Sequence, residues 1–155
     1  GDMVMKGYYN QPEETAKTLE GGWYHTGDLC AMEADGQLIV KDRKKDIIIS
    51  GGENISSLEI EQVLYGHPAV LECAVIGKQD EKWGEVPLAF IVLREGFKVS
   101  PEEFIQYARD NLAHFKAPRE VRMIPEFPKG GTGKILKSVL RERYRGAEKF
   151  WNSEC

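Results

Sequence analysis

The sequence predicts an α+β fold in which a β-rich first part precedes a small mixed β-sheet flanked by helices. Residues 21–50 combine short β-branched runs with turn signals, as strands and their connections do. After residue 52, helical and strand-like patterns alternate along the chain. The 155 residues, 41% hydrophobic and 30% charged, are enough to bury a core.

In the first part, the β-branched runs Leu38–Val40 and Ile47–Ile49 predict two strands. The turn signals around them are Gly21-Gly22, Thr26-Gly27-Asp28 and Ala34-Asp35-Gly36. Six consecutive charges at 41–46 separate the two runs. They fit either a hairpin turn or an exposed connector between domains, and the sequence leaves both open.

A first helix is predicted after Ser56, because Glu59 stands three residues later in the capping-box arrangement. Gly66 and Pro68 end this helix. Its apolar face consists of Ile60, Val63 and Leu64. A short amphipathic helix is therefore expected here.

Strands are predicted at 70–76, 88–93 and 120–124. The second of these is apolar at nearly every position, which is typical of a strand covered on both faces. Between the last two, Ser100 and Pro101 begin a helix with Glu103 at its third position. Its apolar face consists of Phe104, Ala108 and Leu112.

The end of the chain combines a glycine-rich loop at 129–133 with a final helix. Apolar residues recur at helical spacing there, at Ile135, Leu136, Val139, Leu140 and Tyr144. No internal repeat is found.

Composition excludes several classes of protein. The net charge of −4 argues against broad nucleic-acid binding. The longest apolar runs, such as Leu88–Leu93, are far shorter than the ~20 residues of a transmembrane helix, so none is expected. Cys30, Cys73 and Cys155 form no CxxC pattern, which predicts neither a disulfide framework nor a zinc site. A cytoplasmic location fits these features best.

The beginning of the chain suggests a fragment of a longer protein. Gly1 stands in place of an initiator Met, and no signal-peptide pattern follows it. The turn-rich segment Lys6–Asn10 comes without any element before it.

The loop at 128–134 invites comparison with a phosphate-binding P-loop. It does not fit, because Pro128 lacks an amide hydrogen and Ile135 stands where a magnesium-binding Ser or Thr belongs. What remains is Lys134, whose point charge could meet a phosphate or a carboxylate. Alternatively, it is an ordinary solvated lysine.

Asp28 and Arg43 are further candidates for a binding site. A carboxylate in the Thr-Gly-Asp turn can accept two hydrogen bonds from a ribose diol, although such turns are also ordinary structure. Arg43 could hold an anionic or hydroxyl-bearing ligand, or belong to a solvated turn. His25 has no second ligand at metal spacing and is expected to be a strand histidine rather than a catalytic base.

Taken together, four segments resemble the adenylate-forming enzymes, and more narrowly the C-terminal part of an AMP-forming acyl-CoA synthetase. They are Gly7–Asn10, Trp23–Asp28, Asp42–Ile55 and Pro128–Ile135. The resemblance extends from Gly7 to about Arg145. It implies that a carboxylic acid attacks ATP to give an acyl-adenylate and pyrophosphate, and that coenzyme A then displaces AMP. It also implies Mg²⁺, with ligands outside this chain.

The resemblance assigns roles to individual residues. Asp28 and Arg43 would bind the ribose hydroxyls of the adenylate. Lys45 would be the hinge about which a small C-terminal domain rotates between the two half-reactions.

Three further residues receive roles in the two half-reactions. Lys134 would reach the acyl carboxylate and the α-phosphate during adenylation, as the catalytic lysine. Gly51 and Gly52 would line the tunnel for the pantetheine arm of coenzyme A, where a missing side chain allows close approach. No metal ligand is expected among these residues.

The same resemblance divides the chain into residues 1–44, the end of a large adenylation domain, and residues 45–155, a small mobile C-terminal domain. The partners implied are a carboxylic acid, ATP, coenzyme A and the missing N-terminal domain of the same protein. Because the family's phosphate loop, adenine pocket and acyl pocket lie in that missing domain, the isolated chain is expected to be inactive.

Departures from the family pattern narrow the prediction. In the loop Lys129-Gly130-Gly131-Thr132, many members have a Thr or Pro in place of one glycine, which predicts a more mobile loop than usual. Ser56-Ser57, together with Trp83–Pro87, favours the fatty-acyl or medium-chain branch.

Two alternatives stay open. The chain could be a stand-alone module that binds a nucleotide, coenzyme A or a protein without catalysis. It could also bind nucleic acid through a basic last helix, which carries Lys134, Lys137, Arg141, Arg143 and Arg145. The acidic total charge weakens the second alternative.

Overall fold

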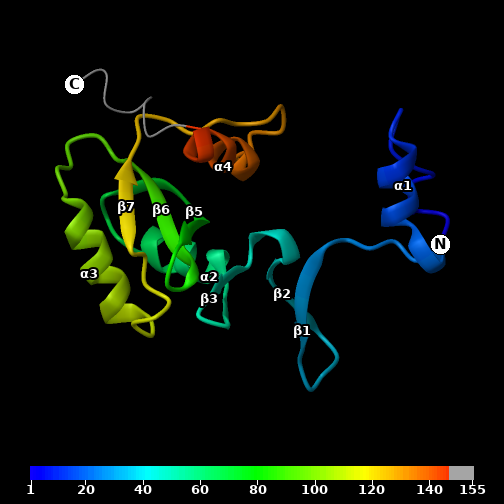
Figure 1. Cartoon of the computed structure of the whole chain (residues 1–155), viewed down its shortest axis with the longest axis horizontal. Coiled ribbons are helices and arrows are strands. Elements are labelled where there is room, and N and C mark those ends of the chain that lie inside the picture. Colours follow the sequence, from blue (N-terminus) through cyan, green and yellow to red (C-terminus); the bar gives the residue numbers. More distant parts are fainter. Residues whose placement is uncertain (147–155) are drawn as a thin grey trace. The chain divides into compact units, whose positions relative to one another are not determined.

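The computed structural model describes residues 1–146, with side chains described to Tyr144. The chain divides into two compact units, Gly1–Lys45 and Asp46–Cys155 (Figure 1). Cys155, and the part of the predicted last helix beyond residue 146, lie outside the described residues. In the described part of the chain, no helix is long and apolar enough to cross a membrane.

The first unit contains a helix and a β-hairpin. Its elements are α1 (Pro12–Thr18), the 3₁₀ turn η1 (Glu20–Gly22), β1 (Asp28–Met32) and β2 (Leu38–Arg43). The two strands pair antiparallel, with a register shift between Leu29 and Cys30. Helix α1 was not expected from the sequence, although a proline at its start and acidic residues in its first turn are N-terminal signals.

The run of charges at 41–46 is a connector rather than a hairpin turn. Its first residues end β2, and Lys44–Asp46 form the 3₁₀ turn η2 that leads into the second unit. The connector is not exposed along its whole length, because Asp42 and Asp46 are buried. His25 also differs from its prediction, since it precedes β1 and its Nε2 lies 3.0 Å from the carbonyl oxygen of Glu20.

The second unit is a mixed sheet with helices, which confirms the predicted α+β class. Its elements are β3 (Ile48–Ser50), β4 (Glu53–Ile55), α2 (Ser57–Tyr65), β5 (Val70–Asp80), β6 (Gly84–Leu93), α3 (Pro101–Asn111), β7 (Glu120–Met123) and α4 (Lys137–Gly146). The sheet order is β4-β3-β6-β5, and β7 pairs with β6 in parallel. The other strand pairs are antiparallel. Strands β5 and β6 extend beyond their predicted bounds, β4 was not predicted, and α4 begins two residues after Ile135.

Both predicted helix caps are present. The Ser56 Oγ accepts a hydrogen bond of 3.2 Å from the backbone N–H of Glu59. The Ser100 Oγ accepts one of 3.3 Å from the N–H of Glu103. Each bond satisfies a backbone donor that the first turn of a helix otherwise leaves unpaired, and this fixes where α2 and α3 begin.

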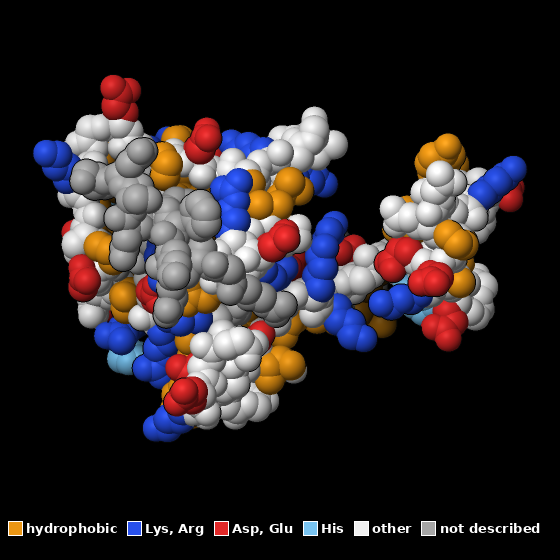
Figure 2. All heavy atoms as spheres, turned by 45° about the horizontal axis from the view of Figure 1, so that its top comes forward, with side chains coloured by type: hydrophobic (Ala, Val, Ile, Leu, Met, Phe, Trp, Pro, Cys, Tyr) orange, Lys and Arg blue, Asp and Glu red, His pale blue; other side chains and the backbone are white. Residues whose placement is uncertain are grey.

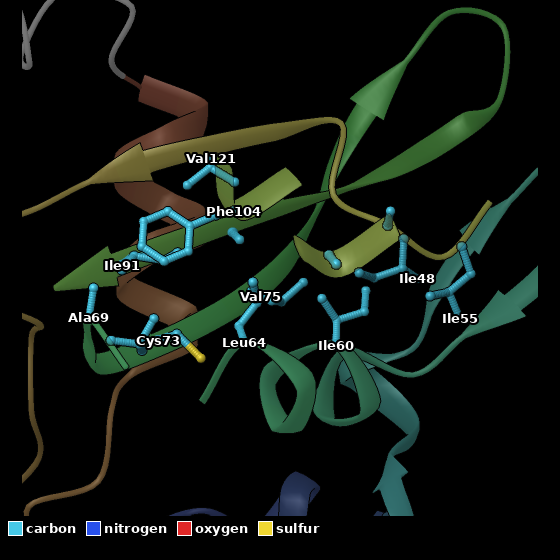
Figure 3. Packing of buried hydrophobic residues seen from close by; sticks show 14 residues of the cluster. Ile48, Ile55, Ile60, Leu64, Ala69, Cys73, Val75, Ile91, Phe104 and Val121 are labelled. Carbon is cyan, nitrogen blue, oxygen red and sulfur yellow. The ribbon is translucent and has the colours of Figure 1, made fainter. Parts of the chain in front are cut away.

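Side chains on opposite faces of the sheet belong to two separate cores. On β6, Ala89 and Ile91 pack with α2 and α3 in one core, whereas Leu88 and Phe90 pack with Leu140 of α4 in the other. Figure 3 shows Ile60 and Leu64 pointing from α2 toward the sheet in the first core. Burial on both faces explains why 88–93 is apolar at nearly every position.

Phe104 of α3 is fully buried in the first core. Phe104→Ala is expected to lower the free energy of unfolding of the chain by about 3–5 kcal/mol, because it removes a large side chain and leaves a cavity. Phe97→Ala is the control, since Phe97 is 44% exposed. Urea unfolding followed by circular dichroism measures both, and equal losses would contradict the packing described here.

Candidate functional site

The structure brings Asp28 and Arg43 together. Asp28 is the first residue of β1, Arg43 is the last of β2, and the strand register makes them direct partners. The Arg43 Nε lies 3.5 Å from the Asp28 Oδ1. The side chains are 57% and 31% exposed, so both can still reach a ligand. A carboxylate beside a guanidinium offers acceptors and donors to neighbouring hydroxyl groups.

Backbone hydrogen bonds fix the turn that presents this pair. Gly27 has a φ of +75°, a left-handed conformation that favours glycine. The N–H of Asp28 donates to the Thr26 hydroxyl at 3.1 Å, and the N–H of Lys44 donates to the Gly27 carbonyl at 2.8 Å. The Thr-Gly-Asp turn is therefore tied to the residue directly after Arg43.

A hollow in the first unit lies beside this turn. Arg43 and Lys45 line it together with the turn residues Thr26 and Gly27, and Tyr24 contributes an aromatic side chain. The lining also includes Lys17, Lys44 and Tyr8, together with the carboxylates of Glu14 and Glu20. Lysine and arginine outnumber the carboxylates there, which with the aromatic rings suits an anionic ligand that carries a flat ring.

Lys45 lies at the boundary between the two units of the chain. It is the middle residue of η2 and the last residue of the first unit. The next residue, Asp46, is buried, and its Oδ1 accepts a hydrogen bond of 2.6 Å from the Arg141 Nη2.

Gly51 and Gly52 form the turn between β3 and β4, and both have positive φ. A Cβ on Gly51 would lie 2.7 Å from the Trp83 Cε3, and the Gly51 N–H donates to the Trp83 carbonyl at 2.8 Å. A Cβ on Gly52 would meet no atom within 4 Å. The close approach at Gly51 is thus to Trp83, while Gly52 faces open space that a ligand could use.

Lys134 lies on a hydrogen-bonded loop ahead of α4. Lys129 and Ile135 form an antiparallel bridge across it, and the Gly130 N–H donates to the Lys134 carbonyl at 2.9 Å. The Lys134 side chain is exposed and forms no hydrogen bond or ion pair with any residue that the structure describes. Its charge is therefore available, whereas the mobility expected of the loop stays a prediction.

The candidate residues thus fall into two sets. Asp28, Arg43 and Lys45 lie in the first unit, and the latter two share one hollow. Gly51, Gly52 and Lys134 lie in the second unit, on two different loops. Among residues 1–146, no three His, Cys, Asp or Glu side chains gather as metal ligands do.

Sequence reasoning missed a group of ion pairs at α4. The Lys137 Nζ lies 2.6 Å from the Glu61 Oε1, and Arg141 pairs with Asp46. The only signal was the spacing of four residues, which places Lys137 and Arg141 on one face of a helix.

These pairs bear on the nucleic-acid alternative, because two of the five basic residues it invokes are engaged inside the second unit. The side chain of a third, Arg145, lies outside the described residues. On the face that Figure 2 shows, Lys and Arg side chains are interspersed with Asp and Glu.

Cys73 is buried in the first core, and its thiol donates to the Glu61 carbonyl. Burial raises the pKa of its thiol far above the ordinary value, and the nearby charge of Glu61 raises it further. The thiol therefore stays protonated at neutral pH, and only a thiolate is a good nucleophile.

Comparison with known proteins identifies the class. Residues 59–134 match the family described as AMP-binding enzyme C-terminal domain. A 2-methylpropanoate–CoA ligase of Humulus lupulus is 48% identical over 94% of this chain and 27% of its own length. The peroxisomal benzoate–CoA ligase of Arabidopsis thaliana is 46% identical over 94% of the chain and 27% of its own length.

Solved structures agree with this. The o-succinylbenzoate CoA synthetase of Bacillus subtilis, in complex with its acyl-adenylate intermediate, has a TM-score of 0.82 at 41% identity, covering 91% of this chain and 29% of that one. The chain belongs to the adenylate-forming enzymes and carries their C-terminal domain. It spans about a quarter of the length of the curated relatives it matches.

The two glycines of the β3–β4 turn provide a test of the local structure. Alanine at either position should lower the free energy of unfolding by about 1–2 kcal/mol, because the backbone has a positive φ at both positions. Gly51→Ala should lower the free energy of unfolding more than Gly52→Ala does, since only the first substitution introduces a Cβ against the Trp83 ring. Urea midpoints of the two variants measure the difference, and an equal loss would show that Trp83 does not pack on Gly51.

Proposed function

We propose that the protein containing this chain is an AMP-forming acid–CoA ligase. A carboxylic acid would attack the α-phosphate of ATP, forming an acyl-adenylate and releasing pyrophosphate. Coenzyme A would then displace AMP and form a thioester. The observation that carries the proposal is the Asp28–Arg43 pair, because two residues from separate motifs, each assigned to the ribose, are cross-strand partners. The names of the relatives, which are CoA ligases, support the same activity.

In this proposal, the Asp28 carboxylate accepts hydrogen bonds from the two ribose hydroxyls, and Arg43 donates to the same edge of the sugar. The cross-strand register and the Thr-Gly-Asp turn hold both side chains before the nucleotide arrives. Because the two groups are already oriented, little side-chain entropy is lost when the nucleotide binds.

Lys45 would act as the hinge between the half-reactions. Its position as the last residue of the first unit supports this, since a change in its backbone dihedrals would reorient everything from Asp46 onward. Residues 1–44 would then belong to the large adenylation domain and residues 45–155 to the mobile domain.

Lys134 would serve adenylation. The attacking carboxylate and the α-phosphate are both anionic, so an ammonium between them offsets their repulsion and stabilises the charge of the transition state. In the second half-reaction, the open side of Gly52 would face the pantetheine arm of coenzyme A, while Gly51 is occupied by Trp83.

For the acid itself, we propose a fatty acid of medium or longer chain, on the basis of Ser56-Ser57 and Trp83–Pro87. The structure gives three of these residues other tasks: Ser56 caps α2, the Ser57 hydroxyl accepts from the Lys137 Nζ at 2.9 Å, and Trp83 covers Gly51. The relatives' names include 2-methylpropanoate and benzoate. Thioester formation by the full-length protein across straight-chain, branched and aromatic acids tests this choice, and a preference for aromatic acids would reject it.

The chain alone is proposed to be inactive, because the resemblance places the family's phosphate loop, adenine pocket and acyl pocket in the missing N-terminal domain. Mg²⁺ would be held by residues of the rest of the protein. The cytoplasmic location stays a prediction.

Lys134→Ala in the full-length protein should slow acid-dependent pyrophosphate formation by about 10²–10³-fold, the usual loss for one preorganised electrostatic contact. A supplied acyl-adenylate should still react with coenzyme A near the normal rate. Two single-turnover assays, one for each half-reaction, measure this. Normal adenylation by the variant, or an equal loss in both assays, would reject the role of Lys134.

Lys45→Pro tests the hinge. Proline fixes φ near −65° and should trap one domain arrangement, so thioester formation from a preformed acyl-adenylate should slow far more than adenylation does. Lys45→Ala is the control, because it leaves the backbone free. If the rates of both half-reactions fell by the same factor in the proline variant, misfolding rather than hinge restriction would be the cause.

A further inference from the structure

Lys134 itself forms no side-chain contact with the described residues, yet the chain on both sides of it is held by ion pairs. Before the loop, the Lys129 Nζ lies 2.7 Å from the Glu72 Oε1 on β5. After it, at the first residue of α4, the Lys137 Nζ lies 2.6 Å from the Glu61 Oε1 on α2. The loop is therefore fixed at both ends to the body of the second unit.

The second of these contacts is the more enclosed. The side chains of Lys137 and Glu61 are only 19% and 11% exposed. Lys137 also donates to the Ser57 hydroxyl at 2.9 Å, and the Glu61 Oε1 accepts from the Val75 N–H of β5 at 2.7 Å. One carboxylate thus joins α2, β5 and α4, and in a nearly dry site such a network permits little freedom.

Backbone hydrogen bonds carry this constraint from Lys137 back to Lys134. The Leu136 N–H donates to the Pro128 carbonyl at 2.9 Å, and Ile135 bridges Lys129. Lys134 is three residues before Lys137, and its own carbonyl accepts from the Gly130 N–H. A shift of Lys137 would therefore move the backbone from which the Lys134 ammonium extends.

We propose that Lys137, held by Glu61 and Ser57, is a positioning residue that sets the place of the Lys134 side chain for adenylation. The proposal rests on the proposed function of Lys134. The Lys137 side chain is enclosed where α4 meets α2, and it does not touch substrate. Its charge acts on Glu61, and its effect on the reaction passes through the loop.

The experiment uses the full-length protein and the two single-turnover half-reactions. Lys137→Met removes the charge and keeps the aliphatic stem. It should slow adenylation at least about tenfold, because a misplacement of about 1 Å can cost about 10²-fold, while the thioester step stays within about twofold. Glu61→Gln should act in the same direction, and it retains an oxygen that can accept from the Val75 N–H. If Lys137→Met fails to fold, Glu61→Gln carries the test.

Lys116→Met is the matched control. The Lys116 Nζ lies 2.7 Å from the Glu59 Oε1, also on α2, and the pair is likewise partly buried, but it does not hold the Lys134 loop. This variant should leave the ratio of the two half-reaction rates unchanged. A fall in adenylation equal to that of Lys137→Met would show a general effect of ion pairs on α2 and would overturn the proposal.

The decisive comparison is the double variant Lys134→Ala/Lys137→Met. If Lys137 acts only through Lys134, the double variant should adenylate no more slowly than Lys134→Ala alone. If the rate losses of the two single variants multiply in the double variant, or if both half-reactions slow by the same factor, Lys137 is merely structural. Normal adenylation by Lys134→Ala would instead reject the proposed function of Lys134, which distinguishes the two failures.

Discussion

The ion pair between Arg141 and Asp46 is the contact on which the arrangement of the second unit depends. Asp46 is its first residue and lies next to Lys45, while Arg141 lies on α4, so one hydrogen bond of 2.6 Å joins the beginning of the unit to α4. Removing one partner of a buried pair leaves an uncompensated charge and typically costs about 3–5 kcal/mol. Helix α4 buries few apolar side chains, chiefly Leu140, and its place is therefore set largely by charge.

The sheet supplies the rigid body to which these charges attach. Its two faces carry separate cores, one under α2 and α3 and one under α4. Glu61 reaches from α2 to the backbone of β5 and also pairs with Lys137 of α4, so helices on opposite faces share a carboxylate. The loops that carry Gly52 and Lys134 both start from this body. In this account, a rotation at Lys45 would move the two loops together.

Local signals in the sequence predicted local structure well. Ser56 and Ser100 cap the predicted helices, and the apolar run at 88–93 is a buried strand. Each of these features depends on residues near one another in the chain. The short elements α1, β1 and β4 lack a strong hydrophobic period, and they were missed.

The site was predictable only in part. The motifs identified Asp28, Arg43 and Lys134 one at a time, but only the strand register shows that Asp28 and Arg43 are partners. The partners of Lys137 and Arg141 lie 76 and 95 residues earlier, a separation across which spacing carries no information. The burial of Asp46 could not be predicted for the same reason, because its enclosure comes from a distant helix.

The central claim, that the second unit carries Lys134 as one rigid body, is tested most directly by distances between spin labels in the full-length protein. One label would be placed at the exposed Thr132 of the Lys134 loop and the other at the exposed Glu53 beside Gly52, with Cys30 and Cys155 replaced by serine. A second labelled pair, Thr132 and the exposed Lys41, would span Lys45. When ATP and the acid are replaced by an acyl-adenylate analogue and coenzyme A, the first distance should stay constant and the second should change. A changed first distance with a constant second one would contradict it.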